Sequence, residues 1–319
     1  MKLKRVLKEC SGYLFIISAV TLFASPNFMY GKNNKDSSLT FEALMENQIT
    51  SQENKPEAFR PEHIALNVPD PIAKAKWYVN NLSMEIIRQG GAPNYTTFVG
   101  DKGKHIMFEL YHNADYPLFD AAKISHMSIH FAFMVSDIQK VKSDLLKAGA
   151  ALVEDVTKTP SGDLVLMMRD PWGLPIQFVT RTKPMMEFSE FRPEHIALNV
   201  PDPIAKAKWF EKNLGYKIVR QGDAPTYTTF IADQNDNMMV ELFNNTNYPL
   251  LDISNISYMS IHFASVVCNI DAVKENLIKA GAKLAEDVKT TQSGDKVMML
   301  RDPWGQPIQF VTRAVPMLK

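Results

Sequence analysis

An exact internal repeat is the feature of this sequence that most restricts its fold. Residues 59–77 read FRPEHIALNVPDPIAKAKW, and the same letters return at residues 191–209. Residues 169–181, RDPWGLPIQFVTR, return at residues 301–313 with one change. Both pairs are offset by 132 residues, so neither copy carries an insertion relative to the other. A repeat of this length predicts two copies of one structural unit.

A fainter repeat lies inside each copy. Each copy contains two related strings that begin at a histidine. They are HIALNVPD at His63 and HFAFMVSD at His130 in the first copy, and HIALNVPD at His195 and HFASVVCN at His262 in the second. Each copy therefore looks like two related modules placed end to end. We expect one domain at residues 58–185 and a second at residues 190–317, joined by a short segment.

The residue pattern predicts the same order of elements in every module. Side chains alternate in type along residues 63–68, which is typical of a strand with one face towards a core. Asp70 can cap a following helix, and Pro71 suits its first turn. The further elements expected in the first repeat are strands near residues 84–88, 95–99 and 105–111, a strand from residue 127, a helix from Asp137 to Gly149, and strands near residues 151–156, 164–169 and 175–180. The order βαβββ, four times, predicts an α+β protein.

The first 57 residues have a different character. Basic residues precede the apolar run 13–23, and the small residues Ala24 and Ser25 follow it. This layout predicts a secretory signal peptide at residues 1–24 and a periplasmic or secreted protein, with an uncleaved anchor as the alternative. Residues 25–57 are polar and lack apolar periodicity, so we expect a flexible tether.

Charge limits the kinds of partner. The formal net charge is 0, and it falls to −3 if residues 1–24 are removed, because four basic residues and one acidic residue leave. Nothing in this balance favours nucleic acid, or a membrane after signal cleavage, as a partner. The hydrophobic share of 45% is that of a globular protein.

Polar residues recur at matching positions of the predicted strands. Glu109 lies between Phe108 and Leu110, so it should point away from the helices that those two face. The same argument applies to Gln177 between Ile176 and Phe178. If the two modules of a repeat pair, the first copy brings together His63, Glu109, His130 and Gln177, and the second copy offers His195, Glu241, His262 and Gln309. Two imidazoles and one carboxylate suit a divalent Zn, Fe, Mn, Co or Ni ion, with the Gln carbonyl as a further oxygen ligand.

The strings HIALNVPDP, FELYHN, HFAFMVSDI and RDPWGLPIQFV, with the βαβββ doubling, resemble the vicinal oxygen chelate superfamily. This superfamily includes glyoxalase I, fosfomycin-resistance enzymes, extradiol dioxygenases and bleomycin-binding proteins. The resemblance implies a cupped mixed sheet in each domain and metal ligands at the four positions named above. It also implies that the metal chelates two adjacent substrate oxygens.

One departure affects the mechanism that the resemblance implies. Glyoxalase I places a glutamate on the last strand, where it resembles a general base, whereas this chain has Gln177 and Gln309. A carboxamide cannot accept a proton at any relevant pH. Ordinary glyoxalase chemistry is therefore not expected from these residues.

Other polar and aromatic residues could line the site. The candidates for substrate binding are Arg88, Tyr95 and Asn113 in the first repeat and Arg220, Tyr227 and Asn245 in the second. Each has a structural alternative as an exposed strand residue, a core aromatic or a strand end. His105, His112 and His126 lack a histidine counterpart in the second repeat and are expected at the surface or in a pocket. The RDPWG segment is expected to form a tight turn.

These features leave three classes of function open. The leading hypothesis is an exported metal-dependent lyase, isomerase or dioxygenase acting on a small oxygen-rich molecule. The alternative is a protein that sequesters a small molecule without turnover, which the missing general base favours. The third is a partner-binding protein in which duplication provides surface. The tandem copy could also replace the dimer that single-domain relatives form, so the chain could be monomeric.

Overall fold

The computed structural model describes residues 59–318. These residues contain the expected βαβββ order four times, so the α+β class is confirmed. No helix in this part of the chain is long and apolar enough to cross a membrane. The signal peptide and the tether predicted at residues 1–24 and 25–57 lie outside the described residues and stay predictions.

We number the modules 1 to 4 along the chain. Module 1 contains β1 (Arg60–Asn67), α4 (Pro71–Asn81), β2 (Met84–Gln89), β3 (Thr97–Asp101) and β4 (Met107–Tyr111). Module 2 follows the short helix η2 (Ala121–Lys123) and contains β5 (Ile129–Met134), α5 (Ile138–Lys147), β6 (Ala151–Lys158), β7 (Leu164–Arg169) and β8 (Pro175–Thr180). Module 3 contains β9 (Pro193–Asn199), α6 (Pro203–Leu214), β10 (Lys217–Gln221), β11 (Thr229–Ala232) and β12 (Met239–Phe243). Module 4 contains β13 (Ile261–Val266), α7 (Ile270–Lys279), β14 (Lys283–Thr290), β15 (Lys296–Arg301) and β16 (Pro307–Thr312).

Each module has one main helix, and the residue before it caps it. The Asp70 side chain accepts a hydrogen bond of 2.9 Å from the backbone N–H of Ala73, and Pro71 occupies the first turn of α4. Asp137 caps α5 in the same way, and Gly149 follows that helix with a left-handed φ of 88°. These caps satisfy backbone donors that the first helical turn leaves free. The predicted starts of both helices are therefore confirmed.

The strands form two eight-stranded mixed sheets, and each sheet joins the two repeats. One sheet has the order β14-β15-β16-β13-β1-β4-β3-β2, so module 4 pairs with module 1. The other has the order β10-β11-β12-β9-β5-β8-β7-β6, so module 3 pairs with module 2. Mixed sheets built from two modules are confirmed, but the expectation that neighbouring modules of one repeat pair with each other is wrong. The seams are the antiparallel pairs β1 with β13 and β5 with β9.

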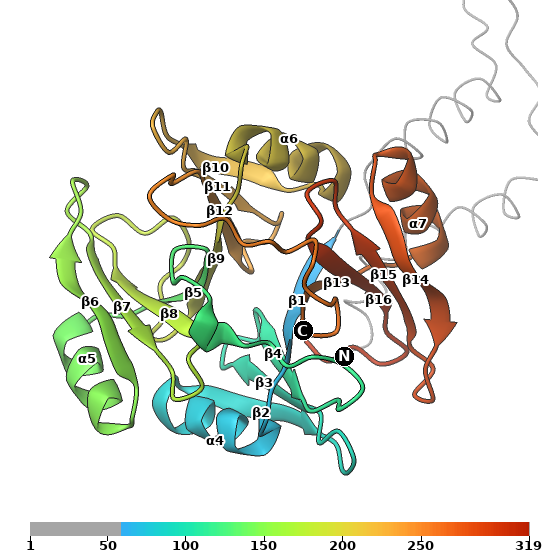
Figure 1. Ribbon diagram of the computed structural model, residues 1–319, viewed down its shortest axis with the longest axis horizontal. Coiled ribbons are helices and arrows are strands. Elements are labelled where there is room, and N and C mark those ends of the chain that lie inside the picture. Colours follow the sequence, from blue (N-terminus) through green and yellow to red (C-terminus); the bar gives the residue numbers. More distant parts are fainter. Residues whose placement is uncertain (1–58, 319) are drawn as a thin grey trace, which may run out of the picture. The chain divides into compact units, whose positions relative to one another are not determined.

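The modules of one repeat contact each other through helices instead. The Trp77 indole of α4 donates to the carbonyl of Ala148 just after α5, over 2.8 Å. Lys74 of α4 forms a buried ion pair with Asp170 beyond β7, with 2.5 Å between Nζ and Oδ2. Trp209 and Lys206 make the same contacts in modules 3 and 4. The four modules therefore form a closed ring in which sheet seams alternate with helix contacts (Figure 1).

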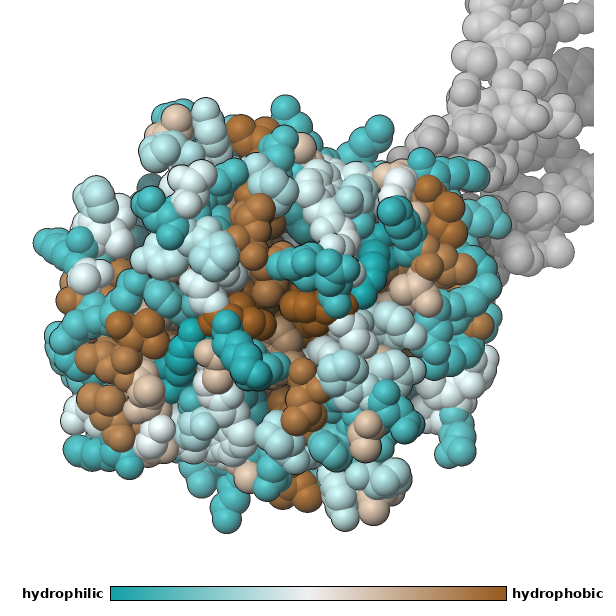
Figure 2. Space-filling view, in the orientation of Figure 1, coloured by the Kyte–Doolittle hydropathy of each residue, from teal (hydrophilic) through white to brown (hydrophobic). Residues whose placement is uncertain are grey.

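The main core lies on the helix side of the sheets. Phe108 of β4 packs edge-to-face against Tyr78 of α4 and against Phe131 of β5, with ring centroids 5.3 and 5.5 Å apart. Leu110 belongs to the same cluster and is fully buried. Glu109, between these two apolar residues, is thus left for the opposite face of its sheet. Hydrophilic side chains cover most of the surface seen in Figure 2, with apolar groups gathered near its middle.

Candidate metal centres

The strand register places the predicted polar residues in two adjacent rows across the middle of each sheet. In one sheet the rows are Glu109, Ala65 and His262, and then His63, Ala264 and Gln309. In the other they are Glu241, Ala197 and His130, and then His195, Ala132 and Gln177. Residues paired across strands, and residues two apart along one strand, point to the same face. The alanines between the polar groups leave that face open.

The first sheet forms what we name centre A. Its donors are His63, Glu109 and His262, whose ligand atoms all lie within 4.8 Å of one another. Nε2 of His63 is 3.0 Å from Oε2 of Glu109. The two imidazole rings meet edge-to-face with centroids 5.9 Å apart. Three potential ligand atoms thus converge on one small volume.

Centre B in the second sheet repeats this arrangement. Nε2 of His195 lies 3.0 Å from Oε2 of Glu241, and Nε2 of His130 lies 4.0 Å from the same oxygen. Glu241 and Gln177 line a pocket of about 320 Å³, whose apolar wall includes Phe230. This volume is enough for a small organic molecule. Centre B therefore combines a convergent donor set with space beside it.

The grouping of donors differs from the expected one. His63 and Glu109 meet His262 and the Gln309 strand, not His130 and Gln177 of their own repeat. The reason is the seam between β1 and β13, which pairs module 1 with module 4. Each centre takes a His–Glu pair from one repeat and a histidine from the other, and the strand register adds the glutamine of that second repeat.

The unpartnered nitrogens of the four histidines test whether these residues fit a metal ion. Within the described residues, Nε2 of His63, His130, His195 and His262 is buried and has no hydrogen-bond partner. The Nδ1 atoms are all partnered, so in the neutral rings Nδ1 carries the proton and Nε2 presents a lone pair. Ligands on one ion with bonds of about 2.1 Å lie about 3.0 to 3.4 Å apart. The 3.0 Å approach of His63 to Glu109, without hydrogen-bond geometry, fits such an ion.

The charges in each centre also favour a cation. Burial would raise the pKa of Glu109, but His63, His262 and Arg313 outweigh it and lower the pKa below the ordinary value. Burial is also the main influence on His262, and it lowers the pKa of that ring to about 4, so the ring is neutral at pH 7. Burial opposes protonation of His63 as well, yet the carboxylates of Glu109 and Glu62 raise its pKa. The carboxylates that favour a proton on His63 also favour a cation beside it.

A buried carboxylate supports one histidine of each centre, and the sequence did not reveal it. Glu62 is 1% exposed, and its Oε2 accepts a hydrogen bond of 2.9 Å from Nδ1 of His63. Arg313 donates to both oxygens of Glu62. Burial would raise the pKa of Glu62, but the hydrogen bonds from His63 and Arg313 lower it to about 2. Glu194, Arg181 and His195 form the same chain in centre B.

A β-bulge explains why these carboxylates escaped the strand pattern. Glu62 and His63 are neighbours in β1, so simple alternation would send them to opposite faces. The register with β13 shifts between Pro61 and His63, which leaves Glu62 as an extra residue. A bulge of this kind re-aims a side chain. The letters PEH occur at the start of both strands, but a single sequence does not show that they contain a bulge.

Arg88 and Arg220 lie near the centres, as the substrate prediction requires. The Arg220 guanidinium stacks on the Phe230 ring at 4.4 Å and lines the pocket of centre B. Arg88 stacks on Phe98 at 4.6 Å, and Phe98 packs edge-to-face on His63. Contact of either arginine with a substrate stays a prediction.

The other four substrate candidates lie in exposed loops or make local backbone hydrogen bonds. Tyr95 and Tyr227 are 41% and 42% exposed, in loops before β3 and β11, and both have a left-handed φ of 48°. Asn113 and Asn245 each accept a hydrogen bond from a backbone N–H two residues later. Tyr227 and Asn245 are not among the residues that line the pocket at centre B. Their role in substrate binding stays a prediction.

The three histidines without a histidine counterpart in the second repeat lie outside both donor sets. His105 contacts Asp101, His112 contacts the carbonyl of Val68, and His126 contacts Glu154. The RDPWG segment does form a turn, in which Gly173 has a φ of 83°. Its Asp170 has a second role, because it also accepts from Lys74 and Tyr78 of α4.

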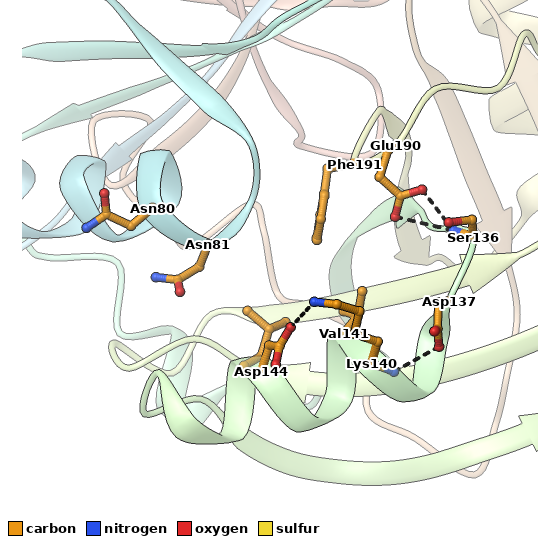
Figure 3. A pocket seen from close by; sticks show the side chains of 10 residues that line it. Asn80, Asn81, Ser136, Asp137, Lys140, Val141, Asp144, Glu190 and Phe191 are labelled. Carbon is orange, nitrogen blue, oxygen red and sulfur yellow. Dashed lines mark hydrogen bonds and ion pairs between the residues drawn. The ribbon is translucent and has the colours of Figure 1, made fainter.

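A larger pocket of about 460 Å³ lies away from both centres (Figure 3). Its wall includes Asn80 and Asn81 at the end of α4, several residues of α5, and Glu190. The charged groups there already have partners. Glu190 accepts from the backbone N–H of Ser136, and Lys140 pairs with Asp144. Nothing in this pocket resembles a catalytic or metal-binding constellation.

Comparison with known proteins assigns the chain to a family. The model of the Glyoxalase/Bleomycin resistance protein/Dioxygenase superfamily matches residues 60–178 and 192–310. The chain belongs to this superfamily. A protein of Brassica oleracea var. gemmifera named putative lactoylglutathione lyase is 22% identical over 262 residues, covering 76% of this chain and 88% of that protein.

Two solved structures agree with this assignment at the level of fold. Glyoxalase I from Zea mays superposes with a TM-score of 0.65 and 20% identity, covering 80% of this chain and 93% of that one. A putative dioxygenase from Bacillus subtilis subsp. subtilis superposes with a TM-score of 0.56 and 14% identity, covering 82% and 88%. The glyoxalase-like fold expected from the sequence is therefore confirmed.

Proposed function

We propose that this superfamily member is a metal-dependent enzyme of the lyase, isomerase or dioxygenase kind that acts on a small oxygen-rich molecule. The observation that carries the proposal is the pair of donor sets with unpartnered, buried Nε2 atoms. Each set would hold one divalent ion through two imidazoles and a carboxylate, with Gln309 or Gln177 available as a weak fourth ligand. The relative named as a lactoylglutathione lyase supports the lyase class.

The residues around centre B suggest how a substrate would be held. A divalent ion bound there supplies a Lewis acid that polarises substrate oxygens. Arg220 offers a positive charge for an anionic substituent, and its stacking on Phe230 limits its freedom. Phe230 and Met167 give the pocket an apolar wall beside its polar lining. Gln177, on the same face, can donate or accept a hydrogen bond but cannot take up a proton.

The two glutamines favour a second candidate function. Neither Gln177 nor Gln309 can act as the general base that the superfamily resemblance would assign to the last strand. A protein that binds a small molecule without turnover needs no such base. We therefore keep non-catalytic sequestration as the alternative.

Metal content after purification without chelator tests the proposal. We expect close to two equivalents of a transition metal in the wild-type chain. His63→Ala should lose the equivalent at centre A and His195→Ala the equivalent at centre B, because each removes one strong ligand. His112→Ala is the matched control, since His112 contacts only a backbone carbonyl, and it should keep both.

Elemental analysis by mass spectrometry measures this directly. Absence of metal from the wild-type chain, even after reconstitution with Zn, Fe, Mn, Co or Ni, would remove the enzyme proposal and leave sequestration in front. Loss of metal in the His112→Ala variant as well would mean that the donor sets are assigned wrongly.

Export of the chain is a separate proposal. It is supported by the basic and apolar pattern of residues 1–24, and it places the protein in the periplasm or outside the cell. We expect the purified mature chain to begin near residue 25. Intact-mass measurement checks this, and a chain that retains residues 1–24 would favour the uncleaved anchor.

A further inference from the structure

The two histidines of each centre are supported in different ways. His63 donates from Nδ1 to the carboxylate of Glu62, over 2.9 Å. His262 donates from Nδ1 to the backbone carbonyl of Tyr258, over 2.8 Å. Centre B repeats the contrast, with His195 on Glu194 and His130 on the carbonyl of His126. In each centre, therefore, one imidazole is hydrogen-bonded to a carboxylate and the other to a neutral backbone carbonyl.

The anion is held more rigidly than a lone buried carboxylate would be. Arg313 reaches Glu62 from the end of β16 with Nε at 2.9 Å from Oε1, and its other nitrogen contacts Oε2. The same guanidinium donates through Nη1 to Asp295, over 2.9 Å. All three side chains are buried or nearly so. A bidentate guanidinium fixes the plane of a carboxylate, and the carboxylate in turn fixes the imidazole.

This chain of contacts also crosses between the repeats. Glu62 and His63 belong to the first repeat, whereas Arg313 and Asp295 belong to the second. In centre B the direction is reversed, because Arg181 of the first repeat holds Glu194 of the second. In each centre the arginine follows the glutamine of that centre by four residues, at the end of the same strand.

We propose that Glu62 and Glu194 are positioning residues for the metal centres. Each fixes the ring orientation and the Nδ1 proton of one histidine, and the negative charge strengthens the Nε2 donor of that ring towards a divalent ion. Arg313 and Arg181 hold the carboxylates in place across the repeat boundary. A carboxylate behind a ligating histidine raises ligand basicity in other metalloproteins. This inference rests on the proposed metal binding.

The experiment is a titration of the metal-free full chain with Co²⁺, in competition with a chromophoric chelator, for wild type and Glu62→Gln. Gln keeps the shape of Glu and can still accept from Nδ1, but it carries no charge. We expect wild-type affinity at centre B and an affinity about 10 to 100-fold lower at centre A, so the titration becomes biphasic. The Co²⁺ absorption bands of centre A should also shift, because the donor strength of His63 changes.

The unmodified centre in the same molecule serves as an internal control for folding. Asp271→Asn is the control variant, because it removes one charge from the exposed start of α7 in module 4 without touching Glu62, His63 or Arg313. It should leave the affinity and the absorption bands of both centres unchanged. Glu194→Gln is the mirror variant, and it should weaken centre B alone. It also tests the proposal if Glu62→Gln fails to fold.

The possible results separate this inference from the proposed function. Wild type that binds no Co²⁺ would overturn both. Wild type that binds two equivalents, with Glu62→Gln binding equally tightly at both centres, would overturn only the positioning role. Equal weakening by Asp271→Asn and Glu62→Gln would also overturn it, since a general loss of negative charge or of stability would then explain the effect.

Discussion

The amide side chains of Gln177 and Gln309 set the limits of the chemistry at each centre. Both lie on the face that carries the donors, one strand from a small alanine that leaves the face open. An amide is neutral, so each proposed site has one anionic ligand, Glu109 or Glu241, against a divalent cation. With a glutamine in place of a glutamate, each proposed centre has a lower total negative charge and one basic group fewer.

Restoring a carboxylate at one of these positions should tighten metal binding there. We expect Gln177→Glu to strengthen Co²⁺ binding at centre B by at least about tenfold, because unit charges about 4 Å apart interact by roughly 4 kcal/mol and desolvation removes only part of this. Metal-free Gln177→Glu should unfold at a lower temperature than wild type, since Glu241 lies in the same pocket.

Calorimetric titration with Co²⁺ checks the affinity. Gln292→Glu adds the same charge at an exposed turn and should change neither quantity. Unchanged or weaker Co²⁺ binding in Gln177→Glu would mean that this side chain does not face the metal.

At the scale of strands and helices, local pattern explains much of the result. Alternation around Glu109 predicted the face that it occupies, because one face of its strand must be buried against the helices. The caps at Asp70 and Asp137 predicted the starts of two helices. The bulge at Glu62 could not be predicted, because it depends on how β1 pairs with β13, a strand about 200 residues away in the chain.

Pairing between modules lies beyond local pattern for a related reason. Strands β5 and β13 begin with similar letters and have almost the same apolar face, so either could pair with β1. In the fold, Trp77 of module 1 contacts Ala148 of module 2 on the helix side, whereas the edge of β1 pairs with module 4. Alternation predicted the face on which these side chains lie, whereas the grouping of the modules required the full set of tertiary contacts.

At the scale of the whole molecule, closure of the ring depends on both repeats. A single repeat would leave the outer edge of β1 and the outer edge of β5 without a partner. Unpaired edges of this kind promote association with another chain. The tandem arrangement pairs the inner edges of β1, β5, β9 and β13 within one polypeptide, and a monomeric chain stays a prediction.

An isolated first repeat, residues 58–185, should therefore form a homodimer. Its β1 would pair with β5 of a second copy, because modules 2 and 4 are close in sequence. Each dimer should bind two Co²⁺ ions, at centres made of His63 and Glu109 from one copy and His130 from the other. Light scattering with metal analysis measures both quantities. A folded monomer that binds metal would contradict the arrangement described above.

The exchange of partners between repeats also has a consequence for how this protein tolerates mutation. Each repeat supplies a histidine and a glutamate to one centre, and a histidine and a glutamine to the other. A point lesion in any one module would disable a single centre and leave its twin complete. Loss of a whole repeat would remove half of both. In genetic terms the duplication confines a substitution to one centre, whereas deletion of one repeat makes both centres depend on pairing with a second copy, and selection on either centre acts on both halves of the gene.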